Sequence, residues 1–321
     1  MPLGHNDVLN IASYKYVLAG GISGGITRAV CQPFDVLKIR FQLQVESFDP
    51  QLGGKYRGLF QAVTTIVKEE GVRALWKGHV PAQSLSITYG CVQFATFELM
   101  SQYISAGTPT ILTLVSSDFL CGILGSTIAT VVSFPFDVIR TRLVAQGNQS
   151  KMYSGTLNAF YLICRDKPTI LFRGLTPTLL QVAPQGGIQF TVYNILSHLF
   201  SLSDYLSSSS AASNPDPQTE RRVLSPLGSL MAGSVAGLTS KVAIYPLDLA
   251  KKRIQVQGFD DARRDFGKTF QCRTLLDCLW KTYRQESLRG LYKGLSPSLL
   301  KAGVTSACHF TAYEHTLRLL S

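Results

Sequence analysis

Charged residues are scarce in this sequence. They make up 16% of its 321 residues, against about 25% in ordinary soluble domains, while 45% of the residues are hydrophobic. Acids are the rarer kind, 20 against 31 bases, which leaves a net charge of +11. The chain is too apolar for intrinsic disorder, and it lacks the dense Lys and Arg of a soluble nucleic-acid binder. Long, weakly charged runs and 27 glycines instead favour helices that pack together in a membrane.

Several functional motifs are absent as well. The seven cysteines are odd in number and contain no C-x-x-C spacing, so we expect no disulfide framework. No H-E-x-x-H motif occurs, and the five histidines lack metal-ligand spacing. The glycine-rich run at residues 20–25 is followed by Ile26, where a phosphate-binding loop requires lysine. We therefore expect neither an enzyme nor a bound cofactor or metal.

The N-terminal residues show no recognisable leader. Residues 1–15 contain a single lysine and no arginine, and no apolar core leads into a small-residue cleavage site. We therefore expect any targeting information to lie within the mature chain.

Two motifs occur three times each along the chain. The first, P-x-D-x-x-[KR]-x-[KR], begins at Pro33, Pro135 and Pro246. The second, [DE]-x5-[FWY]-[KR]-G, follows each copy and ends at Gly78, Gly174 and Gly294. Each unit predicts an apolar helix kinked at its proline, a charged loop with a short amphipathic helix, and a second apolar helix.

These repeats predict an all-α membrane protein with six transmembrane helices in three pseudo-symmetric repeats. The expected spans are residues 14–34, 80–103, 113–135, 175–200, 224–245 and 295–320. The corresponding units are an N-terminal tail (1–13), repeat 1 (14–103), repeat 2 (113–200), a flexible Ser- and Pro-rich linker (201–222) and repeat 3 (224–320). Most bases lie in the loops inside the repeats, which predicts that these loops share one side of the membrane.

The triplicated pair of motifs resembles the mitochondrial carrier family over nearly the whole chain. Two residues depart from the pattern, because Lys167 and Ser287 stand where the family usually has glycine. The resemblance implies a threefold pseudosymmetric bundle in the inner mitochondrial membrane, with the repeat loops in the matrix and both termini toward the intermembrane space. It also implies import without a cleaved presequence, a monomer, contact with membrane lipids such as cardiolipin, and no nucleic-acid partner.

The acid and base of each proline motif lie close to the apolar spans, where a charge must be paired or face water. Three such faces meeting on a pseudo-threefold axis predict a ring of interhelical ion pairs, which would form a gate on the matrix side. The predicted pairs are Asp35 with Arg140, Asp137 with Lys251, and Asp248 with Lys38. Gln42 and Gln255 could brace two pairs, whereas Val144 holds the third equivalent position and cannot. The alternative is a set of solvated charges beside the membrane.

The opposite ends of the even-numbered spans lack the bases that a second ionic ring would need. The aromatic residues and their neighbours there are Phe97-Glu98, Tyr193-Asn194 and Tyr313-Glu314. We therefore expect no strong ionic ring at this end, and these residues are equally well explained as interfacial aromatics and snorkelling acids.

A small substrate lacks threefold symmetry, so its site should lie where the repeats differ. Five residues before the repeat prolines stand Arg28, Thr130 and Lys241, and seven residues past the motif glycines stand Leu85, Gln181 and Lys301. The three cations have no local acid and would suit a substrate with two or more negative charges. The other predicted contacts are Gln83, Gln181, Gln185 and His79, which offer hydrogen bonds to the edge of a heterocycle, and Tyr89, which offers a ring face for a cationic ring or a base. Water or backbone groups could satisfy these uncharged side chains instead.

Within the family, three stretches are most similar to members that carry thiamine pyrophosphate. They are residues 76–83, 245–249 and 292–301. We therefore expect transport of thiamine pyrophosphate, in exchange for nucleotides or deoxynucleotides, through alternating access. One alternative is another phosphorylated-adenine substrate, such as a nucleotide or coenzyme A. The other is a membrane scaffold that keeps the carrier fold without transport.

Overall fold

The structure is a computed structural model that describes residues 5–46, 54–105, 111–148, 151–209, 226–266 and 271–320. These residues contain helices and connecting turns and no strand. The long helices are α1 (His5–Leu43), α3 (His79–Ser105), α4 (Ile111–Ala145), α6 (Leu175–Ser209), α7 (Pro226–Gln255) and α9 (Leu295–Leu320). The shorter ones are α2 (Leu59–Glu70), α5 (Thr156–Asp166) and α8 (Leu275–Leu291), with 3-10 turns η2 (Val72–Trp76), η3 (Pro168–Phe172) and η4 (Asp261–Phe266).

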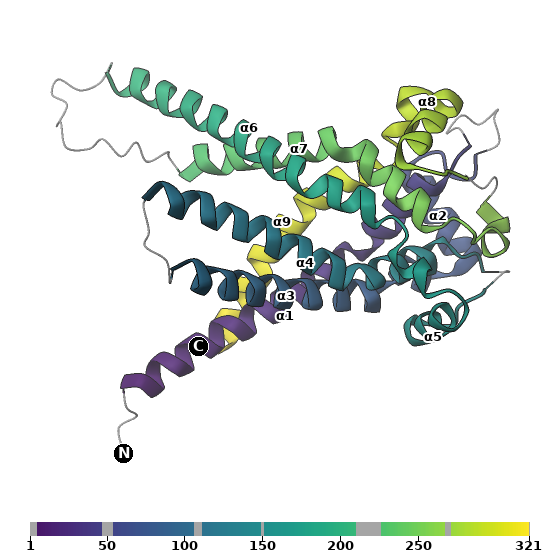
Figure 1. The fold of residues 1–321 in the computed structure, drawn as a ribbon, viewed down its shortest axis with the longest axis horizontal. Coiled ribbons are helices and arrows are strands. Elements are labelled where there is room, and N and C mark those ends of the chain that lie inside the picture. Colours follow the sequence, from purple (N-terminus) through teal and green to yellow (C-terminus); the bar gives the residue numbers. More distant parts are fainter. Residues whose placement is uncertain are drawn as a thin grey trace.

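The long helices form side-by-side pairs that join one repeat to the next. α3 packs on α4, α6 on α7, and α9 on α1, so the chain of repeats closes on itself. Figure 1 shows the three pairs apart at the end that holds both termini, and together at the end where α2, α5 and α8 lie. Small residues permit close approach, and a Cβ on Gly125 of α4 would lie 3.4 Å from the backbone oxygen of Gln93 in α3.

The first long helix of each repeat (α1, α4 and α7) continues beyond its proline. Pro33, Pro135 and Pro246 all lie inside helices, which run on to Leu43, Ala145 and Gln255. These C-terminal extensions contain the acid and base of each proline motif. They therefore bring the charged residues of all three repeats to the same end of the bundle.

The glycine that ends the second motif fixes where the second long helix of each repeat (α3, α6 and α9) begins. Gly78, Gly174 and Gly294 all have positive φ, at +74°, +87° and +85°, which favours glycine. A Cβ on Gly294 would also lie 2.9 Å from both the Lys38 backbone oxygen and the Tyr245 hydroxyl. The motif glycine therefore allows the start of α9 to pack directly against the charged ends of α1 and α7.

The described helices extend further than the expected spans at two places. The linker was expected to be flexible from residue 201, but α6 continues to Ser209, and residues 210–222 lie outside the described part of the chain. The expected N-terminal tail is likewise helical from His5 onward, and its first four residues lie outside the described part. In both places no glycine or proline interrupts the segment that joins the long helix, so extending that helix costs little.

Length and mean hydropathy alone select two of the described helical stretches as able to cross a membrane. They are Cys121–Ala145 in α4 and Gly228–Gln255 in α7. Spanning by all six long helices stays a prediction.

Candidate functional site

The three ion pairs of the expected ring are all present. Asp35 lies 2.5 Å from Arg140, Asp137 lies 2.9 Å from Lys251, and Asp248 lies 2.7 Å from Lys38, measured between carboxylate oxygen and side-chain nitrogen. The pairs join α1 to α4, α4 to α7, and α7 to α1. Their side chains are buried or partly buried, so the alternative of fully solvated charges does not describe them.

Two glutamines contact the ring at the expected places. Gln42 donates from Nε2 to Asp248 Oδ2 at 3.0 Å, and Gln255 donates from Nε2 to Asp137 Oδ2 at 2.8 Å. Gln42 also donates to the Tyr245 hydroxyl, which in turn donates to the Lys293 carbonyl. At the third position Val144 packs in an apolar cluster between the helices.

A second lysine on the Asp137 pair was missed by the sequence analysis. Lys252 donates to Asp137 Oδ1 at 2.8 Å, to Thr141 Oγ1 at 3.0 Å and to Gln255 Oε1 at 3.1 Å. Its equivalents in the other repeats are Ile39 and Thr141, neither of which is charged. The Lys251-Lys252 doublet was visible in the motif and is the signal that could have found this contact.

Lys301 also belongs to the ring, which corrects the expectation of a cation without an acid. Its ammonium donates to both carboxylate oxygens of Asp35, at 2.7 Å and 2.8 Å. The two residues are 266 positions apart, so reading the local sequence around Lys301 could not reveal the acid. Asp35 thus accepts from Arg140 of α4 and from Lys301 of α9 at the same time.

A pocket of about 190 Å³ lies between α1 and α9 directly beside this shared acid. Its lining residues are Gly24, Thr27, Arg28, Cys31, Asp35, Lys301, Thr305 and His309. Arg28 and Lys301, two of the predicted substrate cations, therefore face the same space. Two lining residues were missed: Cys31, which contacts the Thr305 hydroxyl, and His309, which contacts the Ser23 hydroxyl. Lys301, Thr305 and His309 follow one another at intervals of four residues, which places them on one face of α9 and could have indicated His309.

The remaining predicted contacts do not line that pocket. Lys241 donates to the Ser298 carbonyl at 2.9 Å, and Gln83 lies near Gly25, with 3.4 Å between its Nε2 and a Cβ built there. Gln181 is buried and its Nε2 has no hydrogen-bond partner, whereas Gln185 is exposed and Tyr89 is partly buried. Their roles toward a substrate stay predictions.

His79 lies in a different place from the one expected. It lines a separate cavity of about 300 Å³ between the beginnings of α3 and α5, together with Lys77, Lys151 and Tyr153. Its Nδ1 is buried without a hydrogen-bond partner.

Two of the three predicted outer positions hold acids, Glu98 in α3 and Glu314 in α9, and α6 has Asn194 at the equivalent position. Glu98 accepts from Gln102 at 3.2 Å, and both Glu98 and Glu314 are exposed. Within the described ranges neither acid forms an ion pair.

A second set of ion pairs lies on the side of α2 and α8. Glu70 accepts from Arg40 at 2.6 and 2.7 Å and from Lys77 at 2.5 Å. Burial by itself would raise the pKa of the Glu70 carboxyl, but the bonds from Arg40 and Lys77 outweigh it and hold that pKa below its ordinary value. Glu286 forms the equivalent ion pairs with Arg253 and Lys293. Sequence reasoning found these residues as motif positions but not as partners.

Comparisons with known proteins agree with the threefold repeat of the sequence. The family described as "Mitochondrial carrier protein" matches residues 10–107, 113–204 and 222–321, one segment for each repeat. The mitochondrial thiamine pyrophosphate carrier of Homo sapiens is 41% identical over 312 residues, covering 96% of this chain and 92% of the relative. Mitochondrial thiamine pyrophosphate carrier 1 of Emericella nidulans is 36% identical, covering 95% and 92%. Mitochondrial thiamine diphosphate carrier 1 of Arabidopsis thaliana is also 36% identical, covering 92% and 91%.

Proposed function

Because the chain belongs to the mitochondrial carrier family, we propose that it transports thiamine pyrophosphate across the inner mitochondrial membrane by exchange for nucleotides. Membership of the family makes it a mitochondrial transporter and not an enzyme. The substrate named for the human, fungal and plant relatives supports the choice of thiamine pyrophosphate, since each comparison covers more than nine-tenths of both chains.

The observation that carries this proposal is the pocket that Arg28 and Lys301 share with Asp35. A diphosphate offers several oxygens to a forked guanidinium and an ammonium, which suits this pair of cations. Lys241, from the equivalent position in repeat 3, supplies a third positive charge near the same end of the bundle. The uncharged residues Gln83, Tyr89, Gln181 and Gln185 would read the rest of the ligand.

Lys301 connects this pocket to the gate. A phosphate oxygen that accepts from Lys301 competes with Asp35 for the same ammonium, and Asp35 is the acid of one gate pair. Substrate binding would therefore act on the ring that joins α1, α4 and α7, whose three pairs must separate for the matrix side to open. A ligand shifts such an equilibrium only through its different affinity for the two states, and this competition supplies that difference.

The orientation follows the family pattern. The side with α2, α5 and α8 would face the matrix, both termini would face the intermembrane space, and the protein would work as a monomer. The cavity lined by Lys151 and by Lys77, which is paired with Glu70, is basic, which supports contact with an anionic lipid such as cardiolipin.

Two alternatives are separated by the same experiment. The cations recognise phosphate groups more directly than they recognise thiamine, which keeps an adenine nucleotide or coenzyme A as the second candidate. A scaffold without transport is disfavoured because the gate pairs and pocket cations are intact.

The test is uptake of labelled thiamine pyrophosphate into proteoliposomes that hold purified protein. Thiamine, its monophosphate, adenine nucleotides and coenzyme A are added as competitors, with and without nucleotide inside the vesicles. We expect uptake that requires internal substrate and that excess thiamine pyrophosphate blocks better than thiamine. Uptake of coenzyme A or a nucleotide without uptake of thiamine pyrophosphate would replace the proposed substrate, and no uptake of any of them would favour the scaffold.

A further inference from the structure

The segment that follows α7 crosses the ends of the other two repeats. We call residues 256–263 the strap. It leaves α7 after Gln255, turns at Gly258, where φ is +70°, and enters η4. It contains no member of the ion-pair ring and none of the predicted substrate contacts.

An aromatic stack and backbone hydrogen bonds anchor the strap on repeat 2. The Phe259 ring is stacked on the Tyr153 ring, with 5.2 Å between centroids and 9° between planes. Phe259 also lies in a buried cluster with side chains of α4 and α5. Nearby, the Ala262 carbonyl accepts from the Gly147 amide at 2.9 Å, and the Gln257 carbonyl accepts from Arg173 at 2.6 Å.

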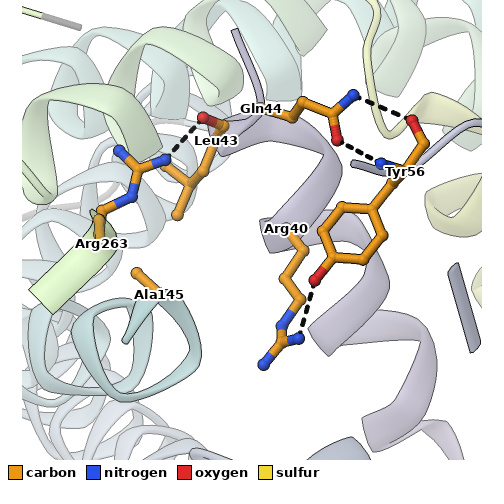
Figure 2. Close-up of a pocket in the computed structure, with 6 residues that line it drawn as sticks. All are labelled: Arg40, Leu43, Gln44, Tyr56, Ala145 and Arg263. Atoms are coloured by element: carbon orange, nitrogen blue, oxygen red, sulfur yellow. Dashed lines mark hydrogen bonds between the residues drawn. The ribbon is translucent and has the colours of Figure 1, made fainter. Parts of the chain in front are cut away.

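The tip of the strap reaches repeat 1. Arg263 donates from its Nη2 to the Leu43 carbonyl at the C-terminal end of α1, at 2.8 Å, as Figure 2 shows. Arg263 is 3% exposed and lines a small cavity with Leu43 of α1 and Ala145 of α4. At the other end of the strap, Val256 packs with Leu43 and Val144.

The strap therefore spans the same three helices as the ion-pair ring. Arg263 faces a helix C-terminus, where a positive charge is favourable, and its burial shows that the contact is closed to solvent. α1 cannot move away from α4 and α7 at this end while Arg263 holds the Leu43 carbonyl and Phe259 holds the strap on repeat 2.

We propose that the strap is a second latch on the matrix side, in which Phe259 anchors it to repeat 2 and Arg263 must release α1 in each transport cycle. Both are positioning residues, since neither touches the pocket beside Asp35. The latch concerns closure of the bundle and does not depend on which substrate is carried.

A reversible cross-link tests the latch directly. Leu43→Cys and Arg263→Cys, whose parent side chains line the same cavity, are combined and joined by a short bifunctional thiosulfonate reagent. We expect the linked protein to lose exchange at least tenfold and to recover it when a reductant cleaves the link. Each single cysteine variant, treated identically, is the matched control for reaction at one thiol or at native cysteines. Full exchange by protein that mass spectrometry shows to be linked would overturn the latch.

A second measurement needs no transport at all. Spin labels on the exposed positions Thr64 of α2 and Asn158 of α5 report the separation of repeats 1 and 2 at this end. Arg263→Ala should increase the population at longer distances, while Arg263→Lys, which keeps a charged donor, should stay near the unsubstituted distribution. An unchanged distribution in folded Arg263→Ala protein would overturn the proposal. Failure of thiamine pyrophosphate uptake by the native chain would remove the proposed substrate and leave this distance measurement intact.

Discussion

Repeats 1 and 3 bury a carboxylate between two bases at the short helices α2 and α8, while repeat 2 leaves its carboxylate in solvent. Glu70 is held by Arg40 and Lys77, and Glu286 by the equivalent bases of repeat 3. The equivalent acid of repeat 2, Asp166, has a side chain that is 68% exposed and lies 3.8 Å from the neighbouring Arg165.

The backbone after the acid explains the difference. Gly71 and Ser287 follow the buried acids with φ of +82° and +63°, whereas Lys167 follows Asp166 with φ of −152°. Lys167 precedes Pro168, and a residue before proline is restricted to extended conformations. The chain in repeat 2 cannot make the turn that directs the other two acids inward, and Asp is also one methylene shorter than Glu.

The base of repeat 2 that would pair with this acid is Arg142, and neutral groups satisfy it instead. Arg142 is 2% exposed and forms no ion pair with any carboxylate that the structure describes. It donates to the Tyr153 hydroxyl and to the carbonyls of Gln255 and Gln257, and its guanidinium lies 5.2 Å from the centroid of the Phe259 ring. A buried cation requires partners, and repeat 2 obtains two of them from repeat 3, the carbonyls of Gln255 in α7 and of Gln257 in the strap. The equivalent Arg253 also donates to two carbonyls of the next repeat, those of Gln42 and Gln44, and it pairs with Glu286 in addition. Repeat 2 therefore keeps the carbonyl contacts between repeats but lacks the acid.

Removing a buried acid should have the largest effect. Glu70→Ala leaves Arg40 and Lys77 buried without their carboxylate, and we expect a loss of about 3–5 kcal/mol in the free energy of unfolding. Denaturation of the purified protein in detergent measures it. Glu69→Ala, which removes the adjacent, more exposed acid, is the matched control. A loss no greater than that of the control would contradict the account.

The same carboxylate predicts a dependence on pH. The pKa of Glu70 is lowered in the folded protein. The stability that its negative charge gives to the fold is therefore complete above the ordinary glutamate pKa of ~4.3, and it is lost as the pH falls through the lowered pKa. The stability difference between unsubstituted protein and Glu70→Ala should therefore shrink below about pH 4. A difference that stays constant down to pH 3 would argue against this charge assignment.

Exchanging the residues after the acids should move stability in opposite directions. Gly71→Ser places a side chain at positive φ and should cost about 1–2 kcal/mol, whereas Ser287→Gly should stabilise by about 1 kcal/mol, because the relieved strain exceeds the added chain entropy. Thermal unfolding of the two variants side by side checks this. Equal signs for the two changes would show that backbone strain does not set the difference between the repeats.

Removing the Tyr153 hydroxyl, a hydrogen-bond acceptor for the buried Arg142, should reduce stability moderately. Tyr153→Phe keeps the stack on Phe259 and removes one acceptor from Arg142, so we expect a loss of about 1 kcal/mol. Tyr161→Phe, at an exposed position of α5, is the matched control, and equal effects of the two would remove the hydroxyl from the account.

The smallest effect belongs to the exposed acid. Asp166→Asn should change stability by less than about 0.5 kcal/mol, because an exposed ion pair contributes little. A loss comparable to that of Glu70→Ala would mean that repeat 2 follows the same design as its neighbours after all.

Repetition made the ring predictable from the sequence, whereas contacts that break the symmetry were hidden. Asp35, Asp137 and Asp248 recur with a base at fixed spacing, and three equivalent helices around an axis leave two cyclic arrangements of pairs, of which the structure has the predicted one. Lys301 meets Asp35 only through the packing of α9 on α1, so it looked isolated in its own span. The role of Arg263 depends on the path of the chain after α7, and no motif marks that path.

The Asp248 and Lys38 pair is the best place to test whether the ring is a gate. Unlike Asp35 and Asp137, Asp248 forms an ion pair with one base among the described residues, so reversing this pair breaks no other ion pair there. The measurement is exchange by Lys38→Asp, by Asp248→Lys and by the double variant in proteoliposomes at matched protein content. Each single variant places like charges together and should lose transport, and the double variant should recover a large part of it. A folded double variant as inactive as the singles would contradict a gate built from these pairs.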